Sequence, residues 1–562
     1  MTNKQISLIN FFAMLVFSTL ARSQVVPDAG IFQREIESSR PKTDTSEPSQ
    51  IMPEQGVDDD LNLQHYLIKS FDIQGATLID RKELLALVQN AIGQSLSARQ
   101  LQALGQRLSD YYREHGWLVR VYFPEQDLST GEIRIEIIES RYGGSELKSE
   151  ESRADSALVR DLAVGGLAIG EALDIKRVES GILKANDLPG IQTTAVLEPG
   201  AKTGETRLKL KVSDLPLITG NLNYTNQGIR ATGSNQYQGN LYLNDLLGRG
   251  DQFSVQALGS ENLVSVRGEY GWLLGDFGTR LSIYGSHLQF QLGGSFASVQ
   301  AEGEGRVIGG AFSQTLLRQM DQNLYATVTL ENRLNQSSQL GTLSRQREIN
   351  TLTLSLKGDK TDHWLSTARN FSSLQVSLGH VNHDLASDKT SDALSTKTQG
   401  DFVKFSLHLS RSEYLNENWK VVMDFNGQWA DKNLDSSQKF SLGGPNGVRA
   451  YPVNEAMGDS GWLLNIELQR HLGYGFHGVL FSDTGLIEVN KRLWSGAGAA
   501  SNCYLLSGVG IGLRWNHDQK WQASAMVGLP VTTNPERDRY NQNSDGTRAG
   551  DPAGWLSLTR FF

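Results

Sequence analysis

Cysteine, proline and long apolar runs are all scarce in this sequence. Of its 562 residues one is a cysteine, Cys503, and 13 are prolines. A single cysteine cannot close an internal disulfide, so a disulfide scaffold is excluded. Few prolines beside 57 glycines argue against a disordered tract and favour many turns and strands. Beyond the first residues, no segment approaches the roughly 20 apolar residues of a membrane helix.

The sequence also has fewer positive than negative charges, and it has few motifs that are typical of a catalytic site. The chain has 53 Lys and Arg against 62 Asp and Glu, which gives a net charge of −9 and a pI near 5.7. A nucleic-acid partner is not expected, because such binders usually carry a basic face. The glycines of 508–512 lie in an alternating strand pattern rather than a nucleotide-binding turn, and the histidines lack HExxH spacing. The sequence therefore predicts no enzyme, no metal and no cofactor.

The first residues predict export. Lys4 precedes an apolar run at 8–20, and small residues around Arg22 follow it. A basic start, a short apolar core and a small-x-small site predict a signal peptide at 1–23, cleaved before Gln24. An uncleaved anchor is the alternative, although the run is short for a membrane helix.

Residues 24–39 predict a short helix that begins at Pro27 and Asp28. Its apolar face is thin and consists of Ile31, Phe32 and Ile36. Residues 40–65 are polar and interrupted by prolines, which predicts an extended linker. Its first 21 residues, 40–60, can span up to roughly 70 Å, so the helix can be placed far from the next domain. A disordered N-terminal tail is the alternative.

Two successive units, 66–141 and 142–213, share one order of elements. The first predicts a strand, two amphipathic helices and two strands that alternate with period two. The second repeats this order, with helices near 155–164 and 174–187. Two units of about 70 residues with the same β-α-α-β-β order indicate an internal repeat.

Residues 214–562 alternate apolar and polar positions in many short runs, without a convincing helix. On one face of such a run lie Leu324, Ala326, Val328 and Leu330. In an outer-membrane barrel the apolar face meets lipid and the polar face meets a wet lumen. Only a closed barrel pairs every strand edge inside a bilayer. We therefore expect a transmembrane β-barrel of about 16 antiparallel strands, whose even number returns both barrel ends to the periplasm.

The loop at 431–458 presents a single arginine among turn residues. Its segment FSLGGPNGVRAYP holds Arg449 with two prolines and three glycines, which are Gly443, Gly444 and Gly447. By strand count the loop joins the eleventh strand to the twelfth on the extracellular side, and it is too long for a plain connection. The glycines let the backbone turn closely. An exposed arginine in a flexible loop is the alternative.

With these pieces in place, the chain beyond the signal peptide resembles the TpsB family of two-partner secretion transporters. The family's Val-Arg-Gly-Tyr loop motif is matched by Val448, Arg449, Ala450 and Tyr451. Its F-x-D-x-G strand motif is matched by Phe481, Asp483 and Gly485. The two repeated units are similar to POTRA domains, and NDLLGRGDQF at 244–253 resembles a turn between early barrel strands of the same superfamily.

The resemblance implies that the loop folds into the lumen and that Arg449 meets Asp483 on the thirteenth strand. Arginine suits this role because its planar fork holds a carboxylate with two hydrogen bonds. Ala450 stands where the family has glycine, and we expect that its φ is not positive, so that it carries no strain. The helix at 24–39 corresponds to a plug of the barrel.

The resemblance also implies a function. The chain is expected to bind one large exoprotein in the periplasm through its POTRA domains and to move it through the barrel without ATP. The family's exoproteins are adhesins, haemolysins and contact-dependent inhibition toxins. Outer-membrane lipids and, during insertion, the assembly machinery are further expected partners of a monomer. The alternatives are an assembly factor like BamA or TamA, and a passive porin, which would have no use for the periplasmic domains.

Overall fold

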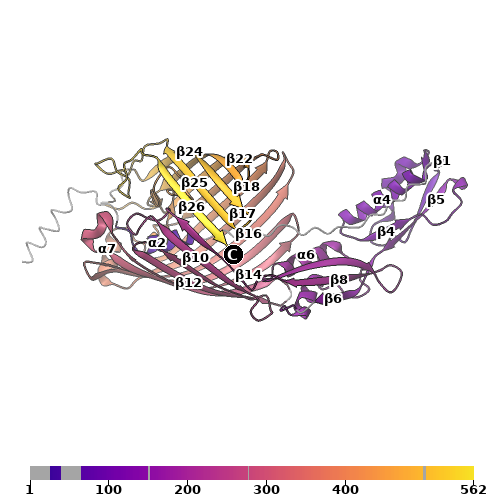
Figure 1. Cartoon of the computed structure of the whole chain (residues 1–562), viewed down its shortest axis with the longest axis horizontal. Coiled ribbons are helices and arrows are strands. Elements are labelled where there is room, and N and C mark those ends of the chain that lie inside the picture. The colour runs from indigo at the N-terminus through magenta and orange to yellow at the C-terminus, as the bar shows by residue number, and fades with distance from the viewer. Residues whose placement is uncertain (1–25, 39–64, 150–151, 276, 496, 498–500) are drawn as a thin grey trace, which may run out of the picture.

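The structure is a computed structural model that describes residues 26–38, 65–149, 152–275, 277–495, 497 and 501–562. The signal peptide expected at 1–23 lies outside these residues, as does the linker expected at 40–65 except its last residue. Figure 1 shows a barrel at one end of the molecule and two small units at the other. Within the described ranges, no helix is long and apolar enough to cross a membrane.

The first small unit is a three-stranded sheet with two helices on one face. The sheet has the order β2-β5-β4, and β2 runs parallel to β5. Its elements are β1 (His65–Leu67), β2 (Ser70–Gln74), α3 (Arg81–Val88), η1 (Gln89–Ala91), β3 (Ser95–Ser97), α4 (Ala98–Glu114), β4 (Val119–Tyr122), η2 (Leu128–Thr130) and β5 (Glu132–Glu139). Helix α4 begins with a capping box, in which Ser97 and Gln100 each bond the other's backbone N–H.

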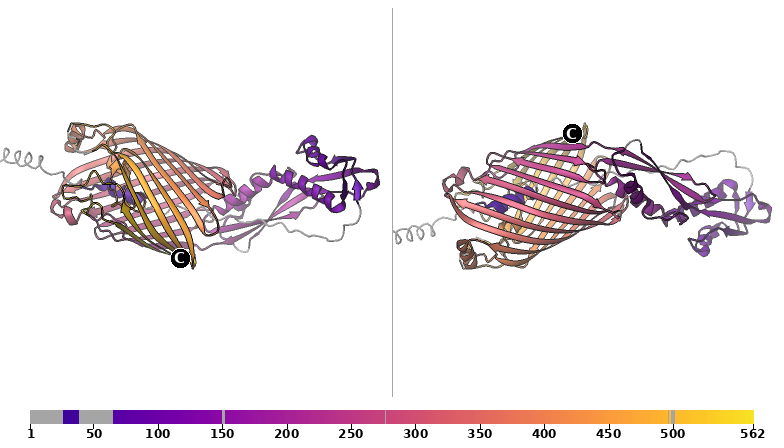
Figure 2. Two further views of the ribbon diagram at one scale, coloured as in Figure 1. Left: turned by 90° about the horizontal axis from the view of Figure 1, so that it is seen from above. Right: turned by 90° about the horizontal axis from the view of Figure 1, so that it is seen from below.

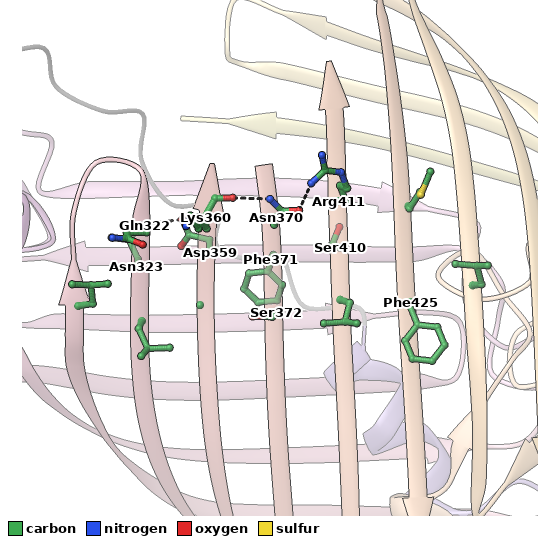
Figure 3. Close-up of a pocket in the computed structure, with 16 residues that line it drawn as sticks. Gln322, Asn323, Asp359, Lys360, Asn370, Phe371, Ser372, Ser410, Arg411 and Phe425 are labelled. Carbon is green, nitrogen blue, oxygen red and sulfur yellow. Dashed lines mark hydrogen bonds between the residues drawn. The ribbon is translucent and has the colours of Figure 1, made fainter. Parts of the chain in front are cut away.

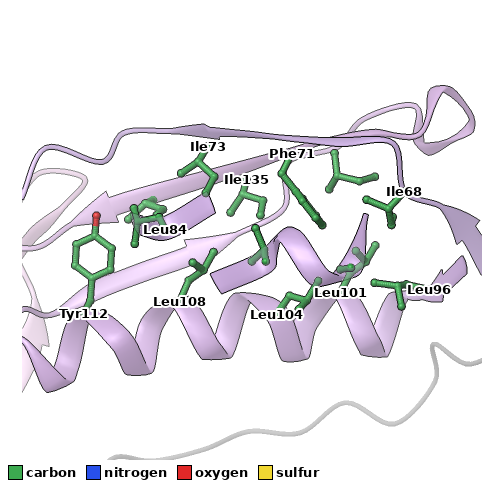
Figure 4. Close-up of a cluster of buried hydrophobic side chains, with 14 of the residues drawn as sticks. Ile68, Phe71, Ile73, Leu84, Leu96, Leu101, Leu104, Leu108, Tyr112 and Ile135 are labelled. Carbon is green, nitrogen blue, oxygen red and sulfur yellow. The ribbon is translucent and has the colours of Figure 1, made fainter. Parts of the chain in front are cut away.

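The core of this unit forms between one face of helix α4 and one face of the sheet. Leu101, Leu104 and Leu108 follow one face of α4 at spacings of three and four residues, and all three are buried. They pack toward Ile73 and Ile135, which point from the sheet to the same side (Figure 4). The amphipathic pattern of the sequence therefore placed this helix correctly.

The second small unit repeats the first. Its sheet has the order β6-β8-β7, again with one parallel pair, β6 and β8. Its elements are β6 (Arg141–Ser149), α5 (Ser156–Val164), α6 (Ile175–Asn186), β7 (Ile191–Pro199) and β8 (Glu205–Asp214). The internal repeat expected from the element order is confirmed.

Sixteen antiparallel strands close the barrel, as the sequence predicted. In chain order they are β9 (Ile218–Thr225), β10 (Gln236–Asn244), β11 (Gln252–Gly259), β12 (Leu263–Leu274), β13 (Thr279–Gln291), β14 (Glu302–Arg318), β15 (Gln322–Gln339), β16 (Thr342–Asp362), β17 (Thr367–His383), β18 (Gly400–Tyr414), β19 (Trp419–Ala430), β22 (Ser460–Gly473), β23 (Phe476–Glu488), β24 (Cys503–His517), β25 (Trp521–Pro530) and β26 (Ala553–Phe561). The end of the barrel that adjoins the two units is called the periplasmic end below, and the opposite end the outer end.

The two faces of the barrel wall differ as the alternation predicted. Thr327, Thr329 and Glu331 of β15 line the lumen, whereas the apolar residues between them point outward. Leu330 shows this plainly, because its side chain is 61% exposed on the outer wall. An outer wall of leucine and valine suits lipid, and a lumen of threonine, serine and charged groups suits water.

One helix in the barrel region escaped the sequence interpretation. α7 (Ala386–Leu394) lies in the outer loop between β17 and β18, where no helix was expected. Its sequence has no strong apolar stripe, and its acidic side chains are held by tertiary contacts instead. Arg347 of β16 bonds both oxygens of Asp388 at 3.0 and 2.9 Å. Asp392 accepts from the backbone of Thr398 and Gln399. Contacts of this kind override weak local propensity.

The second unit is attached to the periplasmic end of the barrel by an ion pair. Arg318 is the last residue of β14, and Asp187 directly follows α6. The arginine donates to both carboxylate oxygens of Asp187 at 2.8 Å. The arginine is buried, and it also bonds Asn323 of β15. A second contact joins the β10–β11 turn to the unit, because Asp155 donates its backbone N–H to Gly248. The turn resembling the superfamily motif thus lies against the second unit.

Arg318→Ala should loosen the second unit from the barrel. The pair is partly buried, so its loss is expected to cost about 1–3 kcal/mol of the docking free energy. Spin labels on cysteines introduced at Thr194 and Ser372, in a Cys503→Ser background, should give a broadened distance distribution. Arg177→Ala, which removes an exposed pair within the second unit, is the matched control. Equal distributions in all three proteins would contradict this docking role.

Candidate functional site

The loop between β19 and β22 folds back into the barrel. It contains η4 (Ser436–Gln438) and a short antiparallel pair, β20 (Phe440–Ser441) and β21 (Met457–Gly458). Its apolar side chains form a buried cluster with the barrel wall, made of Leu442, Val448, Ala450, Tyr451, Ala456, Leu463, Ile487, Tyr504 and Leu506. The loop therefore has a core of its own and is not a flexible connection.

The three predicted glycines of this loop serve two purposes. Gly444 has a φ of +104°, which an L side chain rarely adopts. Gly443 and Gly447 are needed for close approach instead. A Cβ on Gly443 would collide with the carbonyl oxygen of Pro452, and one on Gly447 with that of Leu442. Each glycine therefore fits a tight crossing of the backbone at the loop tip.

Arg449 extends from this tip to Asp483 on β23, the thirteenth barrel strand. Its Nε and Nη2 donate to the two carboxylate oxygens at 2.9 and 2.7 Å, and its backbone N–H adds a third bond of 3.0 Å. Asp483 is fully buried and Arg449 is 5% exposed. The structure thus brings together the two residues that the motifs singled out, with the bidentate geometry that arginine favours.

The sequence interpretation did not assign the other members of this network. Nη1 of Arg449 donates to Glu467 on β22, whose carboxylate also accepts from Arg514 at 2.8 and 3.0 Å. Asn465 donates to Asp483 at 2.7 Å and to the carbonyl of Gly447 at 2.9 Å. The alternation of β22 does place Asn465 and Glu467 on its polar face, but only the register reveals that they face the loop.

The remaining residues of the strand motif support the arginine by packing. The guanidinium carbon of Arg449 lies 3.7 Å from the centre of the Phe481 ring, a cation–π contact. Gly485 leaves room for Leu442 of the loop, because a Cβ there would collide with that side chain. Phe481, Asp483 and Gly485 therefore share one face of β23, and all three contact the loop tip.

Ala450 occupies its family-atypical position without strain. It is missing from the positive-φ positions of the described chain. Its Cβ sits where a side chain on Gly508 of β24 would have to be, so that glycine makes the space for alanine. The tip is also held by the last barrel strand, since Trp555 donates its indole N–H to the carbonyl of Arg449 at 2.8 Å. Tyr451 donates to Thr532.

Helix α2 (Ala29–Ser38) lies inside the barrel, between the wall and this loop (Figure 2). It is shorter than the helix expected at 24–39, whose residues 24, 25 and 39 lie outside the described chain. Asp28 caps it by accepting from the N–H of Ile31 at 3.2 Å. Phe32 is fully buried, with its ring centre 4.4 Å from that of Phe290 on β13. Ile36 is partly buried in the same cluster.

Polar contacts link α2 to both the loop and the wall. Arg34 donates to the carbonyls of Ser436 and Lys439 at 3.2 and 3.1 Å. At the wall, Asp28 pairs with Arg345 at 3.0 Å, and Glu37 pairs with Arg333 at 2.7 Å. The helix thus depends on the loop for part of its binding surface.

Glu35 is a buried acid on this helix. One carboxylate oxygen accepts from Gln236 at 3.1 Å, and the other has no hydrogen-bond partner among the described residues. Burial raises the pKa of Glu35 to about 7. Burial also lowers the pKa of the neighbouring Arg34 to about 10, which leaves that group charged at neutral pH. The seated helix therefore favours a protonated Glu35.

Comparison with known proteins agrees with this geometry. The profile of the haemolysin secretion/activation proteins ShlB/FhaC/HecB matches residues 204–515, which is more than half of the chain. A ShlB-type POTRA domain matches residues 66–140.

The chain belongs to the ShlB/FhaC/HecB family.

Relatives that match this chain over most of their length support this membership. The heme/hemopexin transporter protein HuxB of Haemophilus influenzae (strain 86-028NP) is 26% identical over 553 residues, which is 95% of each chain. The outer membrane transporter CdiB of Dickeya dadantii (strain 3937) is 22% identical over 490 residues, 83% of each chain. The solved structure of CdiB from Escherichia coli has the same fold, with a TM-score of 0.67, 20% identity and coverage of 94% of this chain and 95% of that one.

As a member of this family, the chain is an outer-membrane transporter of the two-partner secretion type, which secretes a partner exoprotein. It is not an enzyme. The predicted fold class, family, function and location are thereby confirmed.

Replacing Arg449 by lysine should free the loop tip although the charge is kept. A lysine ammonium cannot satisfy Asp483 and Glu467 with a planar fork, so we expect a loss of about 2–3 kcal/mol. Hydrogen exchange of the loop amides should become roughly 30- to 100-fold faster. Arg306→Lys, at an exposed pair on β14, is the control and should leave loop exchange unchanged. Wild-type protection in Arg449→Lys would contradict the role of the fork.

Seating of α2 should weaken as the pH rises, because of Glu35. Between the ordinary pKa near 4.5 and the seated pKa of about 7, the seated helix holds a proton that the released helix loses. The stabilisation is therefore complete below about pH 4.5 and lost through about pH 7, by at most about 3 kcal/mol. Conductance in planar bilayers should be higher at pH 8 than at pH 5.

Two variants test this assignment, with a chain lacking residues 24–39 as the open-pore reference. Glu35→Gln should abolish the pH dependence and stay closed at both pH values. Glu37→Gln, which removes the pair with Arg333, should raise the conductance at both. A pH dependence that persists in Glu35→Gln would assign it to another group.

Proposed function

We propose that this transporter moves one large exoprotein, in an extended form, through its own lumen, and that α2 leaves the lumen to open the path. The observation that carries this proposal is the polar lumen, which α2 and the loop divide into two cavities. The inner cavity has a volume of about 1110 Å³ and is lined by Arg34 and Glu37 of the helix. The outer one has about 1660 Å³ and is lined by Asp28 and Ile31.

An extended chain needs a continuous passage, so one of the two dividing segments must move. The loop is held by a buried charge network, whereas α2 is a separate short helix. Helix release is therefore the less costly route. The wall that remains is rich in threonine, serine and charged groups, which suits a chain that passes without folding.

The exoprotein would first bind to the exposed sheet edges of the two POTRA units. Strand β7 is one such edge, because it pairs only with β8 in the described chain. Val196 and Leu197 of β7 are exposed, and they offer apolar contacts beside the free backbone groups. Strand addition at such an edge gives affinity through main-chain hydrogen bonds.

The nature of the exoprotein follows from the relatives only as a proposal. The relative with 26% identity over 95% of this chain is named a heme/hemopexin transporter protein, and the CdiB relatives match less of it. We therefore name an exoprotein of the heme/hemopexin type as the first to test. Adhesins, haemolysins and contact-dependent inhibition toxins are the other candidates.

Deleting the gene should remove one very large protein from the culture medium. Wild-type protein should restore it, and Arg449→Ala should restore it poorly, because that substitution leaves the buried Asp483 without its cation and Glu467 with Arg514 alone, at a cost of about 3–5 kcal/mol. Proteomics of medium and outer membrane provides the measurement. A general loss of outer-membrane barrels would instead indicate an assembly factor like BamA or TamA. An unchanged medium and membrane would contradict both functions.

A further inference from the structure

A shallow cavity of about 560 Å³ lies on the outer wall near the periplasmic end, where β15 to β18 meet (Figure 3). Its floor is formed by Gly358 of β16 and Ser372 of β17, which are paired across the two strands. Leu324 on one side and Leu409 on the other flank this floor in the same row. Two small residues between leucines leave a groove between these strands.

The outward orientation of this row follows from the alternation. Lys357 of β16 and Gln375 of β17 line the lumen, so Gly358 and Ser372 point the other way. The groove spans three strand spacings between the flanking leucine backbones, about 14 Å, which is wide enough for a hydrocarbon chain. It lies on the eighth and ninth strands, halfway around the barrel from the closing pair of β26 and β9.

A polar row crosses the same strands on the periplasmic side of the groove. Lys360 pairs across strands with Asn370, and Asn370 pairs with Arg411. Figure 3 shows these three side by side near the strand ends. All three lie within three residues of the periplasmic ends of their strands. The next turn exposes Trp364, the kind of side chain that marks a membrane interface.

The charges of this row leave one cation without a partner. Arg411 is saturated, because its guanidinium bonds Asp362, Glu413 and Asn370. Ser366 adds two further hydrogen bonds to Glu413, and Trp364 adds one to Asp362. The ammonium of Lys360 is exposed, and in the described part of the chain it makes no ion pair or hydrogen bond. A single free cation beside an apolar groove, at the level of the lipid headgroups, matches the chemistry of a phospholipid.

We propose that this groove is a phospholipid site, in which Lys360 binds the lipid phosphate and one acyl chain lies over Gly358 and Ser372. The lipid comes from the periplasmic leaflet, because the polar row stands at that end of the barrel. The site is separate from the transport path, since Gly358, Lys360 and Ser372 point away from the lumen. It attaches the side of the barrel opposite the closing strands to the periplasmic leaflet.

Titration of the full-length protein in detergent with palmitoyl-oleoyl-phosphatidylethanolamine, followed by native mass spectrometry, tests this site. The wild type should retain one lipid at concentrations where Lys360→Gln and Ser372→Leu do not. We expect each variant to bind about tenfold more weakly or worse, the first because it loses a charge-assisted contact and the second because it fills the groove. Both substitutions are on the outer wall, and heat-modified gel mobility verifies that the barrels are folded.

Two matched controls make the result specific. Lys357→Gln removes the same charge from the lumen side of the same strand. Ser482→Leu adds the same bulk to the outer wall of β23, away from the groove. Both should retain the lipid as the wild type does. Equal retention by all proteins would overturn the proposal, as would weakened binding in the controls. If Ser372→Leu alone lost the lipid, the proposed phosphate contact would be overturned, and adventitious binding of an acyl chain would be the only binding left.

Discussion

The placement of the lumen loop depends on one buried cation. Arg449 meets Asp483 and Glu467 at once, and an unpaired ion at this depth would cost several kcal/mol. The two acids come from neighbouring strands, β23 and β22, so the arginine can satisfy both only if the loop tip reaches the wall between them. The strand register sets the positions of the two acids, and the path of the loop sets the position of the arginine, so the two have to match.

The wall is built to receive this tip. Gly485, Gly508 and Gly528 lack side chains where Leu442, Ala450 and the backbone of Arg449 approach. Trp555 of the last strand donates to the carbonyl of Arg449, which carries the contact to the strand that closes the barrel. Strands from the twelfth to the sixteenth therefore contribute to a single seat. The loop helps to bind α2 in turn, because Arg34 bonds two of the loop's carbonyls.

The parts of this architecture that repeat regularly could be predicted from the sequence. Period-two alternation identified the barrel, and helical spacing identified α4. Asp483 was singled out by the family's strand motif, because the alternation of β23 alone is ambiguous. The register between strands could not be predicted, so Glu467 and Asn465 were placed on a polar face but not at the loop. Helix α7 was missed because its stability comes from Arg347, a residue distant in sequence. Lys360 and Gly358 also gave no signal, since a groove exists only once four strands are aligned.

The same contacts indicate which lumen segment can move. The loop tip combines a fully buried acid, a bidentate arginine and an apolar cluster, so its removal would expose charge and core together. Helix α2 is held by an apolar cluster around Phe32, by two ion pairs that each have a partly exposed partner, and by hydrogen bonds to the loop and the wall. The pair of Asp28 with the exposed Arg345 contributes little, because water replaces it when the two groups separate. The buried Glu35 weakens the seat further once it ionises. On the proposed route, a path through the barrel would therefore open at lower cost if the helix left and the loop stayed.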